Sequence, residues 1–105
     1  SCLYFHHSWS NWERHATGPF EPIGHHVLLP QATRLAEADA ACKALLTADV
    51  LRAIVALIPI DWLRWDDAEG TPDELRAIYE RFLSMRLERS ATFTTEANDA
   101  RQTLV

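Results

Sequence analysis

Paired histidines are the residues of this chain whose type and spacing come closest to a site for chemistry. His6 and His7 are adjacent, as are His25 and His26, and imidazole nitrogens are common ligands of zinc and other divalent ions. Adjacent side chains in an extended segment point to opposite faces, so one pair seldom supplies two ligands to the same ion. We therefore predict no metal site, with one member of each pair packing or hydrogen-bonding locally. A metal site on these four histidines is the alternative.

Carboxylates for general acid–base catalysis are the second kind of site to consider. Asp66, Asp67 and Glu69 cluster in the chain, but a catalytic carboxylate needs a pKa that is shifted by burial or by a close partner. An exposed acidic loop provides neither, so we expect a solvated connection. Asp61 stands between apolar residues, and there we expect it to cap a helical turn.

The two cysteines, Cys2 and Cys42, are separated by a distance in sequence that matches no metal-binding spacing. Cys2 with His6 or His7 would make a nucleophilic dyad, yet no third residue is placed to orient it. We expect two reduced, partly buried thiols in a cytoplasmic protein, with a disulfide as the alternative. The sequence thus predicts no catalytic residue.

Nucleotide and nucleic-acid sites also lack their usual residues. The three glycines are isolated, so no glycine-rich loop can hold a phosphate, and no cofactor-binding residue is predicted. The net charge of −5 does not attract nucleic acid. Trp9, Trp12 and Phe20 lack basic neighbours for stacking on bases, and we expect them to pack a loop onto the helices. A row of arginines is expected to form a solvated helix face, with a local basic surface as the alternative: Arg76, Arg81, Arg86 and Arg89.

The elements that would position these residues are predominantly helical. The 105 residues are expected to make one domain or a piece of one, as a fragment of a larger protein would, and a composition with 48% hydrophobic residues and only three glycines favours helix. Residues 1–30 hold all five histidines and are predicted to be an irregular arm, with a short strand at Leu3–Phe5 and an ordered loop over residues 8–24. Residues 31–105 are predicted to form a helical subdomain. No apolar run approaches the ~20 residues that span a bilayer, so we expect no membrane contact.

Apolar residues at spacings of three and four predict three principal helices, near residues 31–46, 48–58 and 72–88. We expect the third helix to break over residues 90–95. A short, weak helix is predicted over residues 96–104. The predicted fold class is therefore all-α.

Capping residues mark two of these helices. Thr47 is a suitable N-cap for the second helix. Thr71 and Glu74 predict a capping box ahead of the third, where Pro72 fits the first helical position. The predicted core consists of Leu35, Cys42, Leu46, Leu51, Ile54, Val55, Ile58, Trp62, Leu75, Ile78, Tyr79, Phe82 and Leu83.

Several segments together resemble a known family. The text "LYFHHSW" runs from Leu3 to Trp9, "HHVLLP" runs from His25 to Pro30, and "LAEADA" and "VLRAIVALIP" follow, ending in "DWL" at Leu63. These segments resemble the C-terminal part of bacterial HipA-like kinases. The shared segments are structural signatures of that family and carry none of its catalytic residues.

The resemblance implies a kinase-type parent that transfers the γ-phosphate of ATP to serine or threonine. The Mg²⁺-binding Asp of the family would lie a few residues before Ser1, and the catalytic loop and ATP-binding lysine would lie further ahead. Leu3–Trp9 would then run just past the metal site, and the helices after Pro30 would belong to the kinase C-lobe. ATP and Mg²⁺ are thus expected for a full-length parent and not for this chain.

The leading functional prediction is a helical scaffold of such a kinase, because the apolar opening segment Cys2–Phe5 reads like the interior of a longer protein. The expected partner is the remainder of the parent or another protein, and a homodimer through the N-terminal arm is a further expectation. A stand-alone helical interaction module is the alternative. A His-based metal-binding regulatory domain is a third hypothesis.

Overall fold

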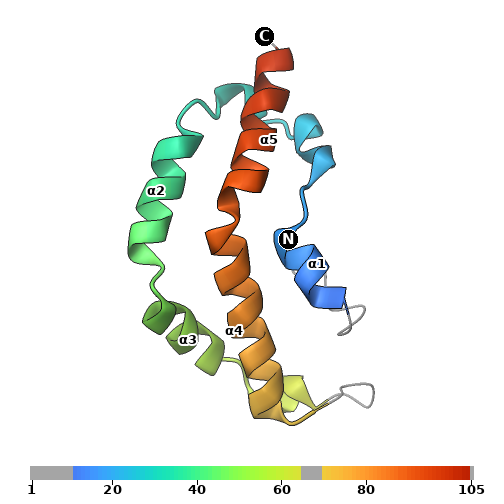
Figure 1. The fold of residues 1–105 in the computed structure, drawn as a ribbon, viewed down its shortest axis with the longest axis vertical. Helices are drawn as coiled ribbons and strands as arrows, with labels where there is room; N and C mark the ends of the chain where they lie inside the picture. Colours follow the sequence, from blue (N-terminus) through green and yellow to red (C-terminus); the bar gives the residue numbers. More distant parts are fainter. Residues whose placement is uncertain (1–10, 65–69, 105) are drawn as a thin grey trace.

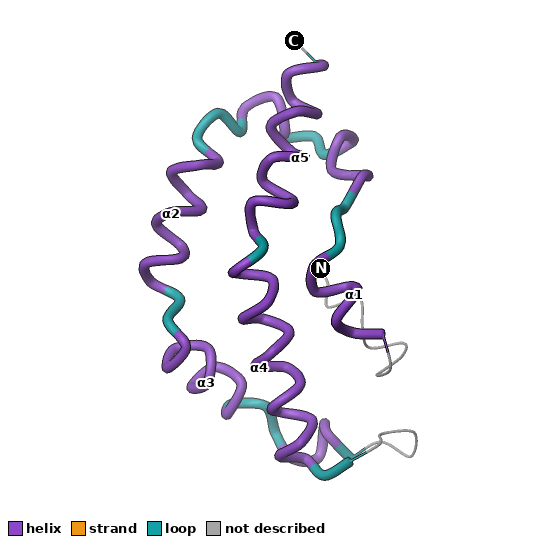
Figure 2. The backbone as a smooth tube through the Cα atoms, in the orientation of Figure 1, coloured by secondary structure: helices purple, strands orange, loops and turns teal. Residues whose placement is uncertain are grey.

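The computed structural model describes residues 11–64 and 70–104, and every regular element in these two ranges is helical (Figure 1, Figure 2). The predicted all-α fold class is therefore confirmed. Five α-helices and three 3₁₀ turns follow one another in the described ranges: α1 (Trp12–Thr17), η3 (Glu21–His25), η4 (Leu29–Gln31), α2 (Leu35–Leu45), α3 (Ala48–Ala56), η5 (Ile60–Leu63), α4 (Pro72–Glu88) and α5 (Ser90–Thr103).

Helices α4 and α5 form a central rod, lying one after the other along the long axis of the molecule (Figure 1). The rod begins at the predicted capping box, which is confirmed. The Thr71 hydroxyl accepts a bond from the Glu74 backbone N–H at 3.2 Å, and the Glu74 carboxylate accepts one from the Thr71 N–H at 2.9 Å. Gly70, just before the cap, has a φ of 118°, a conformation that favours glycine.

The expected break over residues 90–95 is wrong, because only Arg89 separates α4 from α5. Threonines lower helix propensity there, but tertiary contacts outweigh it. The Arg86 guanidinium lies 4.8 Å from the centre of the Phe93 ring, and Ala97 is buried. The Thr94 hydroxyl donates to the Ser90 carbonyl at 2.9 Å, which satisfies it inside the helix.

The shorter helices flank this rod. Figure 1 shows α2 and α3 along one side and α1 with η3 along the other. Helices α1 and α3 pack on α4, whereas α2 and η3 pack on α5. The buried hydrophobic residues concentrate where these elements meet α4 and α5: Trp12, Ala16, Leu29, Leu51, Val55, Leu63, Leu75, Phe82 and Ala97.

The prediction of an irregular arm over residues 1–30 is wrong for its second part, which contains α1, η3 and η4. Trp12 and Ala16 are 7% and 1% exposed and pack against Phe82 of α4. Their spacing of four is helical, but a six-residue helix is too short to show a repeat in the sequence. The packing expected for Trp12 is confirmed, and Phe20 remains 40% exposed. The strand expected at Leu3–Phe5, and Trp9, lie outside the described residues.

The predicted core is correct in its centre and wrong at its edge. Leu51, Val55, Leu75 and Phe82 are buried. Cys42, Ile54 and Trp62 are exposed, the last two at 47% and 68%. Helical spacing shows which residues share a face, but it does not show whether another element covers that face. The remaining predicted core residues are half-buried: Leu35, Leu46, Ile58, Ile78, Tyr79 and Leu83.

The molecule is open for its size. A compact monomer of this mass exposes roughly 6,000 Å², whereas this 12.0 kDa chain exposes 7577 Å². Its radius of gyration is 15.7 Å, against roughly 13 Å for a compact domain of this length. Among the described residues, several large hydrophobic side chains are exposed, including Leu45, Leu57 and Trp62.

Candidate functional site

The histidines that the sequence singled out do not converge in the part of the chain that the structure describes. His25 ends η3 and His26 follows it, and both side chains are exposed. The His26 Nδ1 atom accepts a bond from the Leu28 backbone N–H at 3.2 Å, which is the local role expected for one member of the pair. His6 and His7 lie outside the described residues. Among residues 11–64 and 70–104, no group of three or more metal-ligating side chains occurs.

The other residues considered for chemistry, the carboxylates and the cysteines, also form no common site within the described ranges. Asp61 lies inside η5 and is exposed, and this turn has no side-chain cap, so the expected capping role is wrong. Cys42 is an exposed free thiol rather than a partly buried one, because its side of α2 is left uncovered. The acidic residues Asp66, Asp67 and Glu69, and also Cys2, lie outside the described ranges.

The row of arginines on α4 is not a simple solvated face, and that expectation is wrong for Arg76 and Arg86. Arg76 donates to the Ile58 carbonyl at 2.7 Å and its side chain is only 23% exposed. Arg86 donates to the His15 carbonyl at 3.2 Å and is half-buried. Arg81 lies over the Trp12 ring at 5.2 Å. These cations tie α4 to the elements beside it.

The strongest candidate site is an interaction surface on α3. Thr47 caps this helix as predicted, since its hydroxyl accepts a bond from the Val50 N–H at 3.3 Å. Leu51 and Val55 face α4 and are buried. A second apolar row, spaced by four and three residues, lies beside the buried row, and we call it the outer α3 row: Val50, Ile54 and the C-cap residue Leu57, which are 39%, 47% and 79% exposed.

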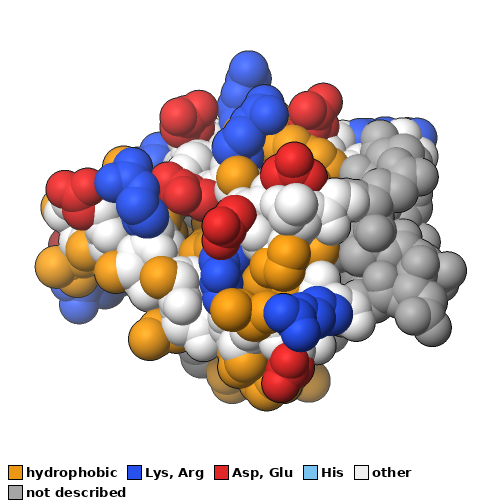
Figure 3. Space-filling view, turned by 90° about the horizontal axis from the view of Figure 1, so that it is seen from below, with side chains coloured by type: hydrophobic (Ala, Val, Ile, Leu, Met, Phe, Trp, Pro, Cys, Tyr) orange, Lys and Arg blue, Asp and Glu red, His pale blue; other side chains and the backbone are white. Residues whose placement is uncertain are grey.

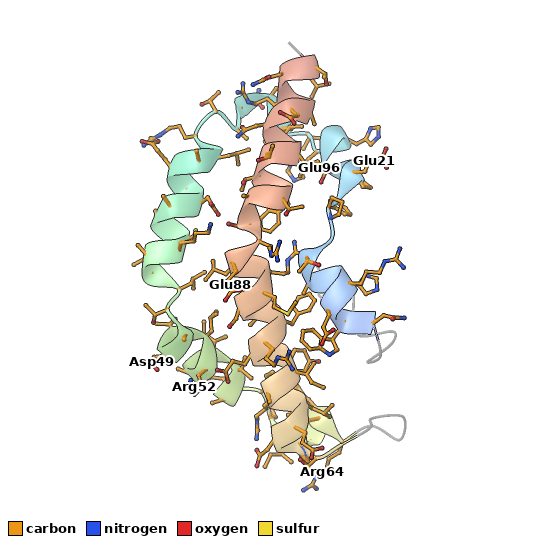
Figure 4. The ribbon with its side chains drawn as sticks, in the orientation of Figure 1. Glu21, Asp49, Arg52, Arg64, Glu88 and Glu96 are labelled. Atoms are coloured by element: carbon orange, nitrogen blue, oxygen red, sulfur yellow. The ribbon has the colours of Figure 1, made fainter. Side chains whose placement is uncertain are left out.

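Charged residues bound this row on one side. Asp49 and Arg52 lie together on α3 (Figure 4), joined at 3.1 Å, and Arg52 also reaches Glu80 of α4 at 3.4 Å. Seen end-on, hydrophobic side chains reach the surface between charged ones across this end of the molecule (Figure 3). An apolar centre with a charged rim is the usual make-up of a protein-binding surface.

Helix α2, directly before α3, adds to the uncovered apolar surface. It contains no buried residue, and Leu45 in its last turn is 72% exposed. Leu35 at the start of α2 is half-buried, and so is Leu46, which follows the helix. The apolar spacing predicted both helices, but the predicted core included Cys42 of α2 and Ile54 of α3, which are exposed.

Comparison with protein-family models, curated proteins and solved structures finds no match to this chain. Within the described ranges, no helix has both the length and the apolar character that crossing a bilayer requires.

Proposed function

We propose that this chain is a helical scaffold whose outer α3 row packs against a protein body. One observation carries the proposal: α3 is apolar on two rows, and the fold buries only the row of Leu51 and Val55. Large exposed apolar patches mark interaction sites in proteins that are otherwise stable in water. The large accessible surface of the chain supports the same conclusion.

The resemblance of residues 3–63 to HipA-like kinases supports one identity for that body, the remainder of such a kinase. In this proposal the helices buttress the segment that carries the Mg²⁺-binding Asp, in the cytoplasm of a bacterium. ATP and Mg²⁺ belong to the full-length parent. This chain contributes support and no catalytic residue.

A stand-alone interaction module is the second candidate, and the same observation favours it. In that case the outer α3 row contacts a different protein or a second copy of the chain. The two candidates differ in their partner and agree on the surface that is used.

The test uses two matched substitutions of exposed apolar residues. Ile54→Lys places a charge in the outer α3 row, whereas Val27→Lys places one at a residue that is 85% exposed between η3 and η4. Both variants should keep the thermal stability of the unmodified chain, since surface substitutions change it little. Each is coexpressed, as a separate chain, with the preceding part of the proposed parent kinase, which we call the upstream polypeptide.

We expect the upstream polypeptide to copurify with the unmodified chain and with Val27→Lys, and to be lost with Ile54→Lys. Retention by Ile54→Lys would remove the outer α3 row as the contact. The other outcome is that the unmodified chain captures no upstream polypeptide and shows a molecular mass that rises with its concentration. If Ile54→Lys abolishes that rise, the chain associates with itself through the outer α3 row, and the stand-alone module is the correct proposal.

Calorimetry tests independently whether the isolated chain has a nucleotide-binding site. We expect no heat of binding when ATP with Mg²⁺ is titrated into the isolated chain. Micromolar affinity for ATP would show that the chain holds a nucleotide site of its own and would overturn the scaffold assignment.

A further inference from the structure

A groove of about 900 Å³ lies on the opposite side of the α4–α5 rod from α3. It runs between the end of α1 and η3 on one wall and the α4–α5 junction on the other. Its volume lies within the range of small-molecule sites. The groove is distinct from the outer α3 row and does not depend on the scaffold proposal.

The walls of the groove are mainly apolar. Phe20 and Ile23 line it from the η3 side, and Phe93 and Ala97 line it from α5, with Leu35 of α2 at its margin. Phe20 is 40% exposed although it lies in the groove. An aromatic ring or a short alkyl chain would therefore find apolar contacts on both walls.

One end of the groove carries a fixed cation. The Arg86 Nη1 atom donates to the His15 carbonyl at 3.2 Å, and the guanidinium lies 4.8 Å from the centre of the Phe93 ring. These two contacts hold the side chain in place, and within the described ranges its guanidinium makes no other hydrogen bond. Arg14 lines the same groove. Within residues 11–64 and 70–104, no carboxylate forms an ion pair with either arginine.

The other end of the groove carries the opposite charge. The Glu96 carboxylate lines it and accepts a bond from the Phe20 backbone N–H at 2.7 Å, and Figure 4 shows Glu96 on α5 beside the η3 segment. Ten residues separate Arg86 from Glu96, which corresponds to about 15 Å along a helix. A second anionic group near Glu96 would be repelled, so the electrostatics select a ligand with one negative end.

We propose that this groove binds a small organic monocarboxylate with an aromatic or short alkyl body. The carboxylate meets the guanidinium of Arg86, where a planar cation offers paired N–H donors. The apolar body lies on Phe20, Ile23 and Phe93. Because the chain carries a net charge of −5, general attraction of anions is absent and binding depends on this local arrangement.

The test compares three probes on the full chain by NMR titration of the backbone amides. The probes are 4-phenylbutyrate, the neutral 4-phenylbutanol, and acetate, which has the charge without the apolar body. We expect 4-phenylbutyrate to cause saturable shifts at Gly18, Phe93 and Thr94, with at least about tenfold weaker binding of the other two, because hydrogen bonds to charged groups are the strong ones.

Two arginine variants complete the experiment. Arg86→Gln should weaken binding of 4-phenylbutyrate by about tenfold or more, whereas Arg89→Gln, which removes the same charge from an exposed residue outside the groove, should not. The thermal stability of each variant shows whether the fold is retained. Should Arg86→Gln unfold the chain, the probe comparison on the unmodified protein still decides.

Any of the following results would overturn the proposal. They are the absence of saturable shifts with 4-phenylbutyrate, equal binding of 4-phenylbutanol, and equal affinity of folded Arg86→Gln. Shifts confined to residues outside the groove would count in the same way.

Discussion

Helices α4 and α2 have similar apolar spacing in the sequence but differ in how far their apolar side chains are buried in the structure. In α4, Leu75 and Phe82 are completely buried, because α1 and α3 pack on that helix. In α2, no residue is buried, and Leu45 is 72% exposed. The difference shows that apolar spacing predicts a helix, whereas burial depends on how closely the neighbouring helices pack on it.

The composition of α2 explains how it forms without a buried face. Five of its eleven residues are alanine, which has the highest helix propensity and little apolar area to bury. Helix α4 carries large side chains and depends on packing. We therefore expect substitutions in α4 to destabilise the whole molecule and matched substitutions in α2 to have small effects.

The largest expected effect comes from Phe82→Ala, compared with Leu45→Ala. Removing a buried phenyl ring leaves a cavity, so the free energy of unfolding should fall by about 3–5 kcal/mol. Leu45→Ala should change it by less than about 0.5 kcal/mol, since that side chain is mostly solvated. Denaturant unfolding followed by circular dichroism measures both. Similar losses in the two variants would mean that α2 is packed as tightly as α4.

The next effect concerns the arginines that tie α4 to its neighbours. Arg76→Met removes the half-buried bond to the Ile58 carbonyl, two residues beyond the end of α3, and should lower the free energy of unfolding by about 1–2 kcal/mol. Arg81→Met, whose side chain is 67% exposed, should cost less. The same denaturant titration compares them. A larger loss for Arg81→Met would indicate that its contact with Trp12 holds the fold more strongly than the Arg76 bond does.

Helix capping gives a smaller effect. Thr71→Ala removes the hydroxyl of a two-bond capping box on α4 and should cost about 1 kcal/mol. Thr47→Ala removes a single bond of 3.3 Å on α3 and should cost about 0.5 kcal/mol. Hydrogen exchange resolved by residue should show the loss in the first turn of each helix. Equal or reversed losses would contradict the expected order.

The smallest effect is a dependence of stability on alkaline pH. Burial raises the pKa of the half-buried Tyr79 on α4, because the phenolate is poorly solvated there. The unfolded chain ionises first, near pH ~10. The contribution of Tyr79 to stability is therefore complete below that pH and is lost as the pH rises through the pKa of the folded state.

Ultraviolet titration of a Tyr4→Phe variant measures the Tyr79 pKa directly, because the chain has two tyrosines. The unfolded variant in denaturant is the reference. An equal pKa in the folded and unfolded states would mean that this face of α4 is as solvated as α2.

Local features were predictable from the sequence and distant contacts were not. Both threonine caps were predicted correctly, because their partners lie three residues away. Arg76 and Arg86 were assigned to solvent, since their carbonyl partners are 18 and 71 residues distant. No periodicity connects such positions.

The candidate site was missed for the same reason. The apolar character of Ile54 was evident, but its exposure depends on the absence of a covering element in the described fold. The groove at Arg86 was not foreseen, because its lining comes from α1, η3, α2, α4 and α5. A fold prediction has to assemble these segments before either surface can be recognised.

The near-continuous axis of α4 and α5 also sets a length. Their 17 and 14 residues correspond to roughly 46 Å of helix, close to the longest dimension of the molecule, 48 Å. Spectroscopic labels at Thr71 and Thr103 would thus measure whether α4 and α5 keep this end-to-end distance in solution. Arg89, which separates the two helices, lies near the middle of this length, and the groove beside Phe93 opens close to it.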